Sequence, residues 1–195
     1  MNNRILICGD SFSADFKHPD SWVTFLSAEY LVDNLSCAGI SEYKILQQLK
    51  SKVTQLDRYS TVIVSHTSPN RVHIKTHPVH SKSKTHFDAD LIFSDTVYHH
   101  EQNPADIVLE TAKNYFVHIF DENYYQEIYY LIQEKIKTIL GNRKVIHLDN
   151  FHVPNNIGLK NYTCLPKRLN LSDGHINHYD IKSNIRIFEF VKAQL

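Results

Sequence analysis

Hydrophobic and polar positions follow two different periods along the first third of the chain. Short runs at residues 3–8, 31–36 and 61–65 predict β-strands, and the last of them is β-branched through its middle. Between these runs, apolar residues recur at helical spacing over residues 21–30 and 43–56. The order strand, helix, strand, helix, strand predicts a parallel sheet with helices on both faces.

The rest of the chain continues this alternation around one irregular segment. Residues 72–104 are rich in His, Lys, Ser and Asp and have weak periodicity, which predicts an inserted loop or lid with a short strand at 91–93. Helical spacing returns in three segments, at residues 104–116, 124–140 and 179–193. A fourth strand is predicted at 144–148, followed by an irregular connection over 149–172. We therefore predict one α/β domain over residues 1–195, with the sheet between two helical layers.

Composition narrows the classes of partner. The chain carries 21 basic and 21 acidic residues, so no net charge draws it to nucleic acid or to an anionic membrane. No run approaches the ~20 apolar residues of a membrane-spanning helix, and no signal peptide is visible. The three cysteines have no C-x-x-C spacing, which is typical of reduced thiols. We expect a cytoplasmic protein with no nucleic-acid partner and no membrane span.

Small and polar residues follow each of the first three predicted strands. Ser11 follows the first, Gly39 follows the second, and residues 66–71 follow the third. These loops share one edge of a parallel sheet, the edge at which open α/β sheets bind ligands. A serine nucleophile needs a general base and a group that orients the base. Asp173 and His175 precede the last helix, and the predicted topology returns them to this edge.

Three blocks of the sequence resemble those of the SGNH, or GDSL, superfamily of esterases and lipases. Gly9-Asp10-Ser11-Phe12-Ser13 resembles the first block, residues 34–39 resemble the second, and Asp173-Gly174-His175 resembles the last. The blocks occur in the family's order and span nearly the whole chain. The resemblance implies a flavodoxin-like fold and two-step acyl transfer by a Ser-His-Asp triad.

The same resemblance assigns roles to individual residues. Ser11 would be the nucleophile, His175 the general base, and Asp173 the group that holds the imidazole. The backbone N–H groups of Ser11 and Gly39 would bind the oxyanion.

Two blocks depart from the family's pattern. In the third block, Gly-x-Asn-Asp, His66 stands in the place of the glycine and Ser68 in the place of the asparagine, with Asn70 as an alternative donor. The last block has the spacing Asp-x-His instead of Asp-x-x-His, so His178 competes with His175 as the base. We favour His175 because it lies nearer the predicted turn.

Several further residues are candidates for binding. Arg71 suits a carboxylate or phosphate, and Asp10 is a second candidate for contact with the substrate. Four histidines invite a zinc interpretation, at positions His73, His77, His80 and His86. No cysteine or acidic ligand joins them at a recognisable spacing, so we interpret them as solvated loop residues and predict neither a metal nor a cofactor.

The function predicted from the sequence is hydrolysis of a small acyl ester, with an acetylated carbohydrate as a possible substrate. An O-acyltransferase that acts on a saccharide would use the same residues, because the two activities differ only in whether water or an alcohol reaches the acyl-enzyme. A non-catalytic binding module with the same fold is the alternative from another class, and the altered third block favours it.

Overall fold

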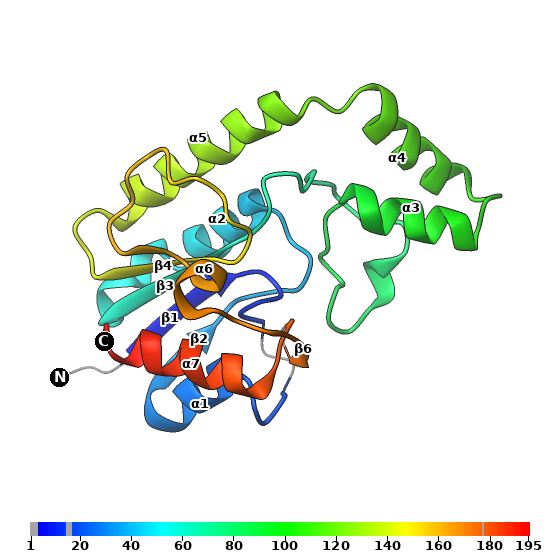
Figure 1. The fold of residues 1–195 in the computed structure, drawn as a ribbon. Helices are drawn as coiled ribbons and strands as arrows, with labels where there is room; N and C mark the ends of the chain where they lie inside the picture. Colours follow the sequence, from blue (N-terminus) through cyan, green and yellow to red (C-terminus); the bar gives the residue numbers. More distant parts are fainter. Residues whose placement is uncertain (1–3, 15–16, 177) are drawn as a thin grey trace.

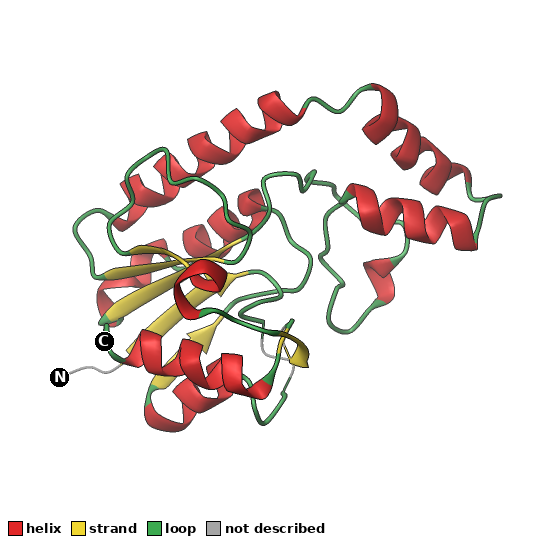
Figure 2. Ribbon diagram, viewed as in Figure 1, coloured by secondary structure: helices red, strands yellow, loops and turns green. Residues whose placement is uncertain are grey.

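The architecture is a parallel β-sheet between two layers of helices, with an arm beyond one edge (Figures 1 and 2). The computed structural model describes the chain except residues 1–3, 15–16 and 177, and it leaves the side chains of residues 175 and 176 undescribed. The sheet has five strands in the order β2-β1-β3-β4-β5, all parallel. This order is that of flavodoxin-like folds and confirms the predicted fold class. The strands are β1 (Arg4–Gly9), β2 (Leu31–Asn34), β3 (Thr61–His66), β4 (Val145–Asp149) and β5 (Tyr162–Cys164).

Alternation along the central strands divides the core between the two faces of the sheet. On β1, Ile5 and Ile7 pack on one face, and Leu6 and Cys8 pack on the other. The first face is covered by α1 (Trp22–Glu29) and α7 (Ile181–Lys192), and the second by α2 (Glu42–Ser51) and α5 (Glu122–Leu140). Because β1, β3 and β4 are covered on both sides, most of their residues are apolar, and the buried histidines of β3 and β4 pair with each other.

Two predicted irregular regions contain regular elements. The segment 72–104, predicted as a loop, includes η2 (His80–Lys82) and the helix α3 (Phe93–Gln102). The predicted strand at 91–93 is only a single bridge, between Leu91 and Val72. The connection 149–172 supplies β5 and the short helix α6 (Leu165–Leu169). The sequence analysis was wrong on these points because each element is short or polar and depends on packing.

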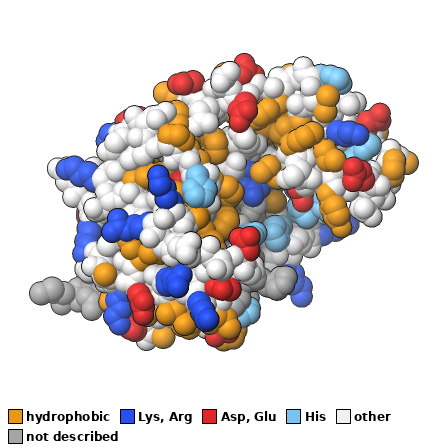
Figure 3. All heavy atoms as spheres, viewed as in Figure 1, with side chains coloured by type: hydrophobic (Ala, Val, Ile, Leu, Met, Phe, Trp, Pro, Cys, Tyr) orange, Lys and Arg blue, Asp and Glu red, His pale blue; other side chains and the backbone are white. Residues whose placement is uncertain are grey.

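The helices α3 and α4 (Ile107–His118) form the arm, which extends past the carboxyl ends of the strands (Figure 1). Val72, Leu91 and Ala112 form a small apolar cluster there, separate from the two faces of the sheet. In Figure 3, apolar side chains gather on the arm, and histidine side chains reach the surface between the arm and the sheet. The remaining elements are η1 (Val53–Arg58), after α2, and β6 (Asp173–Ile176), before α7.

Within the described residues, no helix is both long and apolar enough to cross a bilayer.

Candidate functional site

The turn after β1 places Ser11 at the carboxyl edge of the sheet. Gly9 ends the strand where the backbone meets its neighbours closely: a Cβ there would lie 2.3 Å from Ser13 Oγ and 2.6 Å from Ser65 Cβ. The turn is closed by the Ser13 N–H, which donates to the Asp10 carbonyl at 3.1 Å. Any side chain at Gly9 would therefore displace the turn that carries the serine.

His178 is the histidine that meets Ser11. Its Nε2 lies 3.0 Å from Ser11 Oγ, within reach for proton transfer. The imidazole packs on the ring of Phe12, with ring centroids 4.5 Å apart. A serine near the amino end and a histidine near the carboxyl end are thus neighbours in the fold, as a nucleophile and its base must be.

This geometry corrects the choice between the two histidines. The sequence analysis favoured His175, but the position beside Ser11 is occupied by His178, and the side chain of His175 lies outside the described part of the chain. The reason is a tight hairpin: Asp173 pairs antiparallel with Tyr179, and Gly174 N–H donates to the His178 carbonyl at 3.1 Å. The hairpin turns the backbone so that the residue just before Tyr179 reaches the serine.

Gly174 makes that hairpin possible. A Cβ at this position would lie 2.4 Å from the backbone nitrogen of Asp180, which is far too close for any side chain. His178 itself has a positive φ of 69°, a conformation that non-glycine residues rarely adopt. Backbone strain of this kind is common at functional sites.

Asp173 is near His178 without bonding to it. No hydrogen bond joins the described atoms of Asp173 and His178, although the negative charge of Asp173 raises the pKa of the imidazole. Burial and the positive charge of Arg71 act more strongly in the opposite direction, so the pKa of His178 is lowered from its ordinary value. The histidine is therefore neutral at neutral pH, as a general base must be.

Gly39 lies in the loop after β2, with φ at +77°, where glycine is favoured. Its carbonyl accepts hydrogen bonds from the Asp90 N–H at 2.9 Å and from Arg71 Nη1 at 3.1 Å. In the described part of the chain, neither the Gly39 N–H nor the Ser11 N–H donates to another group. Both amides thus remain available to an oxyanion.

The loop that contains Gly39 is fastened to the turn that contains Ser11. Cys37 N–H donates to the Gly9 carbonyl at 3.1 Å, and Asn34 Nδ2 donates to the Ser13 carbonyl at 2.8 Å. These bonds fix the second predicted block against the first, so that the two amides occupy one rigid edge.

The loop after β3 does not bring Ser68 and Asn70 to Ser11. Ser68 Oγ accepts the Asn70 N–H at 3.2 Å, and Asn70 Nδ2 donates to Glu122 Oε1 at 3.3 Å. No described contact joins either residue to Ser11 or His178. The asparagine amide is directed toward α5, and the residue of this loop that reaches the site is Arg71.

His66, which stands where the family's glycine would be, has a structural partner. Its Nδ1 lies 2.6 Å from Glu42 Oε1, and its Nε2 lies 2.9 Å from His147 Nδ1. Glu42 Oε2 also accepts the Thr67 N–H at 3.3 Å. This buried chain anchors the end of β3 to α2 and explains a histidine at a position where a small residue was expected.

Asp10 is completely buried, so the expectation that it contacts substrate has no support in the geometry. Its Oδ1 accepts the Phe12 N–H at 3.1 Å and thereby shapes the turn. Burial raises the pKa of Asp10 to about 7, while the charge of Arg71 acts to lower it. Arg71 Nε donates a hydrogen bond to Thr67 Oγ1 at 3.1 Å. The same side chain links the loop after β3 to the Gly39 carbonyl by a hydrogen bond and to Asp10 by its charge.

No protein-family model matches the chain, and no curated protein matches it. The function is therefore argued from the geometry of the site.

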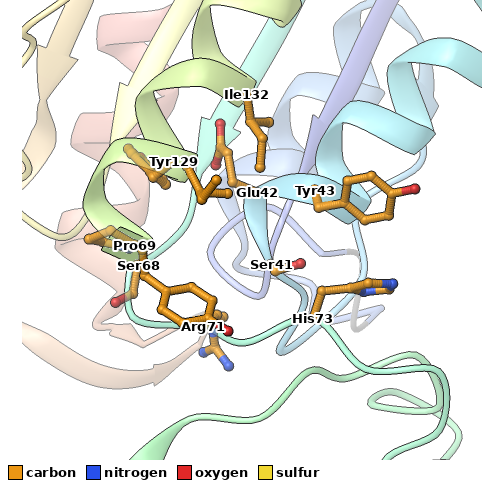
Figure 4. A pocket seen from close by; sticks show the side chains of 11 residues that line it. Ser41, Glu42, Tyr43, Ser68, Pro69, Arg71, His73, Tyr129 and Ile132 are labelled. Carbon is orange, nitrogen blue, oxygen red and sulfur yellow. The ribbon is translucent and has the colours of Figure 1, made fainter. Parts of the chain in front are cut away.

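A small cavity of about 60 Å³ lies between α2, α5 and the loop after β3 (Figure 4). In Figure 4, Ile132 and Glu42 lie toward the helices, and Arg71 and His73 lie toward the loop. Ser11 and His178 do not line it. The cavity therefore adjoins the Arg71 side of the site and does not surround the serine.

The segment 85–90 covers the Gly39 side of the site. A Cβ at Gly39 would lie 3.0 Å from Ala89 Cβ and 3.6 Å from His86 Cδ2. Lys44 Nζ donates to the Asp88 carbonyl at 2.6 Å, which holds this segment onto α2. Ser11 is only 4% exposed, so access to its hydroxyl depends on what covers this edge.

The interpretation of the loop histidines as solvated is wrong for His77, which is 2% exposed. It lies in a cluster with His80 and Asp95. The sequence analysis missed the acidic member because it comes from α3, beyond the spacing of any local motif.

Proposed function

We propose that the protein is a serine ester hydrolase of the SGNH type that acts on a small acyl ester. The observation that carries this proposal is the 3.0 Å approach of His178 Nε2 to Ser11 Oγ at the carboxyl edge of a parallel sheet. Two unoccupied backbone donors, the N–H groups of Ser11 and Gly39, lie in turns that are hydrogen-bonded to each other. The resemblance of the three sequence blocks supports the same chemistry.

The proposed reaction has two steps. His178 Nε2 takes the Ser11 proton as Oγ attacks the ester carbonyl, and the resulting oxyanion accepts hydrogen bonds from the two amides. The tetrahedral intermediate then expels the alcohol, which takes the proton from His178. Water, deprotonated by the same histidine, attacks the acyl-serine, and the carboxylic acid leaves as Ser11 regains its proton.

The charges around His178 suit this cycle. The imidazole is neutral before the attack because burial and Arg71 lower its pKa. The charge of Asp173 stabilises the imidazolium that forms after proton transfer, since it raises the pKa. In this chain Asp173 would act as a nearby charge, while the ring is held in place by packing on Phe12.

A second candidate is a binding module that retains the fold without turnover. Two observations favour it: no described carboxylate is hydrogen-bonded to His178, and Ser11 is nearly covered. The two candidates differ in whether the serine is reactive, so one experiment separates them.

The test combines hydrolysis of short-chain nitrophenyl esters with labelling by a serine-reactive fluorophosphonate. We expect the full chain to hydrolyse the ester and to be labelled once, and the Ser11→Ala variant to lose about 10⁴-fold or more in kcat/KM and all labelling. Ser27→Ala is the matched control, because among the described residues this hydroxyl donates only to the Val23 carbonyl of its own helix.

A folded protein that is neither labelled nor active would favour the binding module. Activity that survives Ser11→Ala would exclude the serine mechanism. Addition of a saccharide acceptor to the assay distinguishes transfer to an alcohol from hydrolysis, because transfer forms an acylated sugar at the expense of the free acid.

A further inference from the structure

Three histidine side chains converge on one carboxylate between η2 and the arm. His77 Nε2 and His80 Nε2 lie 3.5 Å and 3.3 Å from Asp95 Oδ2, and His99 Nε2 lies 3.4 Å from Asp95 Oδ1. The ligand atoms of His77, His80 and Asp95 all lie within 4.8 Å of one another. Asp95 and His99 are one turn apart on α3, so the helix presents both to the segment that carries the other two.

His77 is buried in a way that calls for a partner. Its side chain is 1% exposed, and within the described residues its Nε2 makes no hydrogen bond. A buried polar atom without a partner destabilises the fold. His80 and Asp95 are 23% and 33% exposed, so the cluster is closed on the His77 side and open to solvent on the other.

The separations fit a shared ion better than direct hydrogen bonds. A hydrogen bond between a protonated imidazole and a carboxylate is about 2.7–2.9 Å long. Zinc bonds of about 2.0–2.1 Å in a tetrahedron place neighbouring ligand atoms about 3.3–3.4 Å apart. The two distances between proposed ligand atoms, 3.5 Å from His77 Nε2 and 3.3 Å from His80 Nε2 to Asp95 Oδ2, are near the second value.

We propose that Nε2 of His77, Nε2 of His80 and Oδ2 of Asp95 bind a divalent transition-metal ion, with Zn²⁺ as the best match. Two imidazoles and one carboxylate suit zinc, and a fourth position remains for water on the open side. His99, on the other carboxylate oxygen, is a positioning residue that orients Asp95.

Metal binding must change the tautomer of His77. Its Nδ1 accepts the backbone N–H groups of Val79 at 3.2 Å and of His80 at 3.1 Å, which puts the proton of the metal-free ring on Nε2. To bind the ion, Nε2 gives up this proton while Nδ1 gains one, so the ring stays neutral. The two backbone N–H groups then lose their acceptor, and the turn at residues 77–80 adjusts.

The proposed ion would fasten the segment that covers Gly39. The chain runs from the cluster at His80 through the covering segment 85–90, where Ala89 lies against Gly39, and then to α3. The ion would join the two ends of this stretch, at His80 and at Asp95. The site is independent of the ester-hydrolase proposal, because its ligands take no part in that reaction.

The experiment measures metal binding to the chelator-treated full chain. We expect one Zn²⁺ per chain by calorimetry, and Co²⁺ in the same site to show the visible bands of four-coordinate cobalt. Asp95→Asn and His80→Asn should weaken zinc affinity by at least about 100-fold, and His99→Gln by about 10-fold. The control is His118→Asn, on the exposed end of α4, which should bind as the unaltered protein does.

Each variant is first compared with the unaltered protein by thermal unfolding without metal. His99→Gln should leave that transition unchanged while it weakens binding, which a merely structural role would not do. Zinc should also shift the amide signals of Val79 and His80 in a nitrogen–proton NMR spectrum, which tests the cluster without any substitution. Absence of stoichiometric binding, or equal affinity in Asp95→Asn and the unaltered protein, would overturn the proposal.

Discussion

The turn at Ser11 and the histidine cluster at Asp95 lie on the same side of the molecule, but the chain assembles them in different ways. Ser11 and Gly39 each follow a strand of the parallel sheet, so the topology alone places their loops at one edge. His77 and Asp95 meet because a polar segment folds back onto the start of α3. Local sequence can therefore predict which residues meet at the ends of strands, but it cannot predict which residues meet between packed segments.

The first way to sharpen this comparison, with the largest expected effect, is to substitute the two candidate bases. We expect His178→Ala to lower kcat/KM for ester hydrolysis by about 1,000-fold or more, since Ser11 then has no group to take its proton. His175→Ala should cost much less. Steady-state kinetics of both variants, with circular dichroism to verify folding, make the comparison. A larger loss in His175→Ala would return the base to the position that the sequence favoured.

The choice of histidine shows what the sequence could predict of the site. Ser11 and Gly39 were located because glycine-bearing turns directly follow recognisable strands. The sequence favoured His175, whereas His178 is the histidine that lies beside Ser11, because a short hairpin decides which side chain faces the serine. That geometry depends on the close approach of Gly174 to Asp180, which no spacing rule describes.

The fold shows the same division. The mostly apolar runs of β1, β3 and β4 predicted the centre of the sheet, because parallel strands that are covered on both faces are rich in apolar residues. The edge strand β5 has three residues, too few for a period to be recognised. In α3, histidines and acidic residues occupy many positions, so the sequence shows no clear apolar period from which to predict this helix.

The second test breaks the attachment of the inserted segment and leaves the sheet intact. Asp90 is buried, and its carboxylate accepts the Ser41 N–H at 2.8 Å and the Ile74 N–H at 2.9 Å and pairs with Lys44 at 2.9 Å. We expect Asp90→Ala to lower the free energy of unfolding of this segment by about 3–5 kcal/mol, because buried Lys44 then keeps only the carbonyl and the exposed carboxylate of Asp88 among its described partners. Hydrogen exchange of residues 85–92 reports this loss.

The matched control for that test is Asp88→Ala. Asp88 pairs with the same lysine at 3.0 Å, but its side chain is 48% exposed. Exposed ion pairs contribute about 1 kcal/mol or less. Equal effects of the two substitutions would show that the segment is not held by the buried carboxylate.

The smallest expected effect tests how Asp173 acts on the base. The pKa of His178 is lowered by burial and by the charge of Arg71, and it is raised by the charge of Asp173. His86, from the inserted segment, also faces His178, because His178 contributes slightly to lowering the pKa of His86. In the proposed mechanism the neutral imidazole is the active form, so we expect kcat/KM to rise with pH through this pKa. Removing the negative charge in Asp173→Asn lowers the pKa further and moves the acidic limb of the profile to lower pH.

This direction separates two roles for the carboxylate. If Asp173 acts only through its charge, the limb shifts while the plateau falls by less than about 10-fold, because no hydrogen bond between Asp173 and His178 is lost. If the carboxylate instead orients the ring during turnover, the plateau falls by about 10⁴-fold, as it does when an orienting aspartate becomes an asparagine in a serine triad. The control is Asp57→Asn: Asp57 lies on η1, is exposed and pairs with Arg143. This substitution should change neither the acidic limb nor the plateau. The pH profile of Asp173→Asn therefore distinguishes an electrostatic role of this carboxylate from an orienting one.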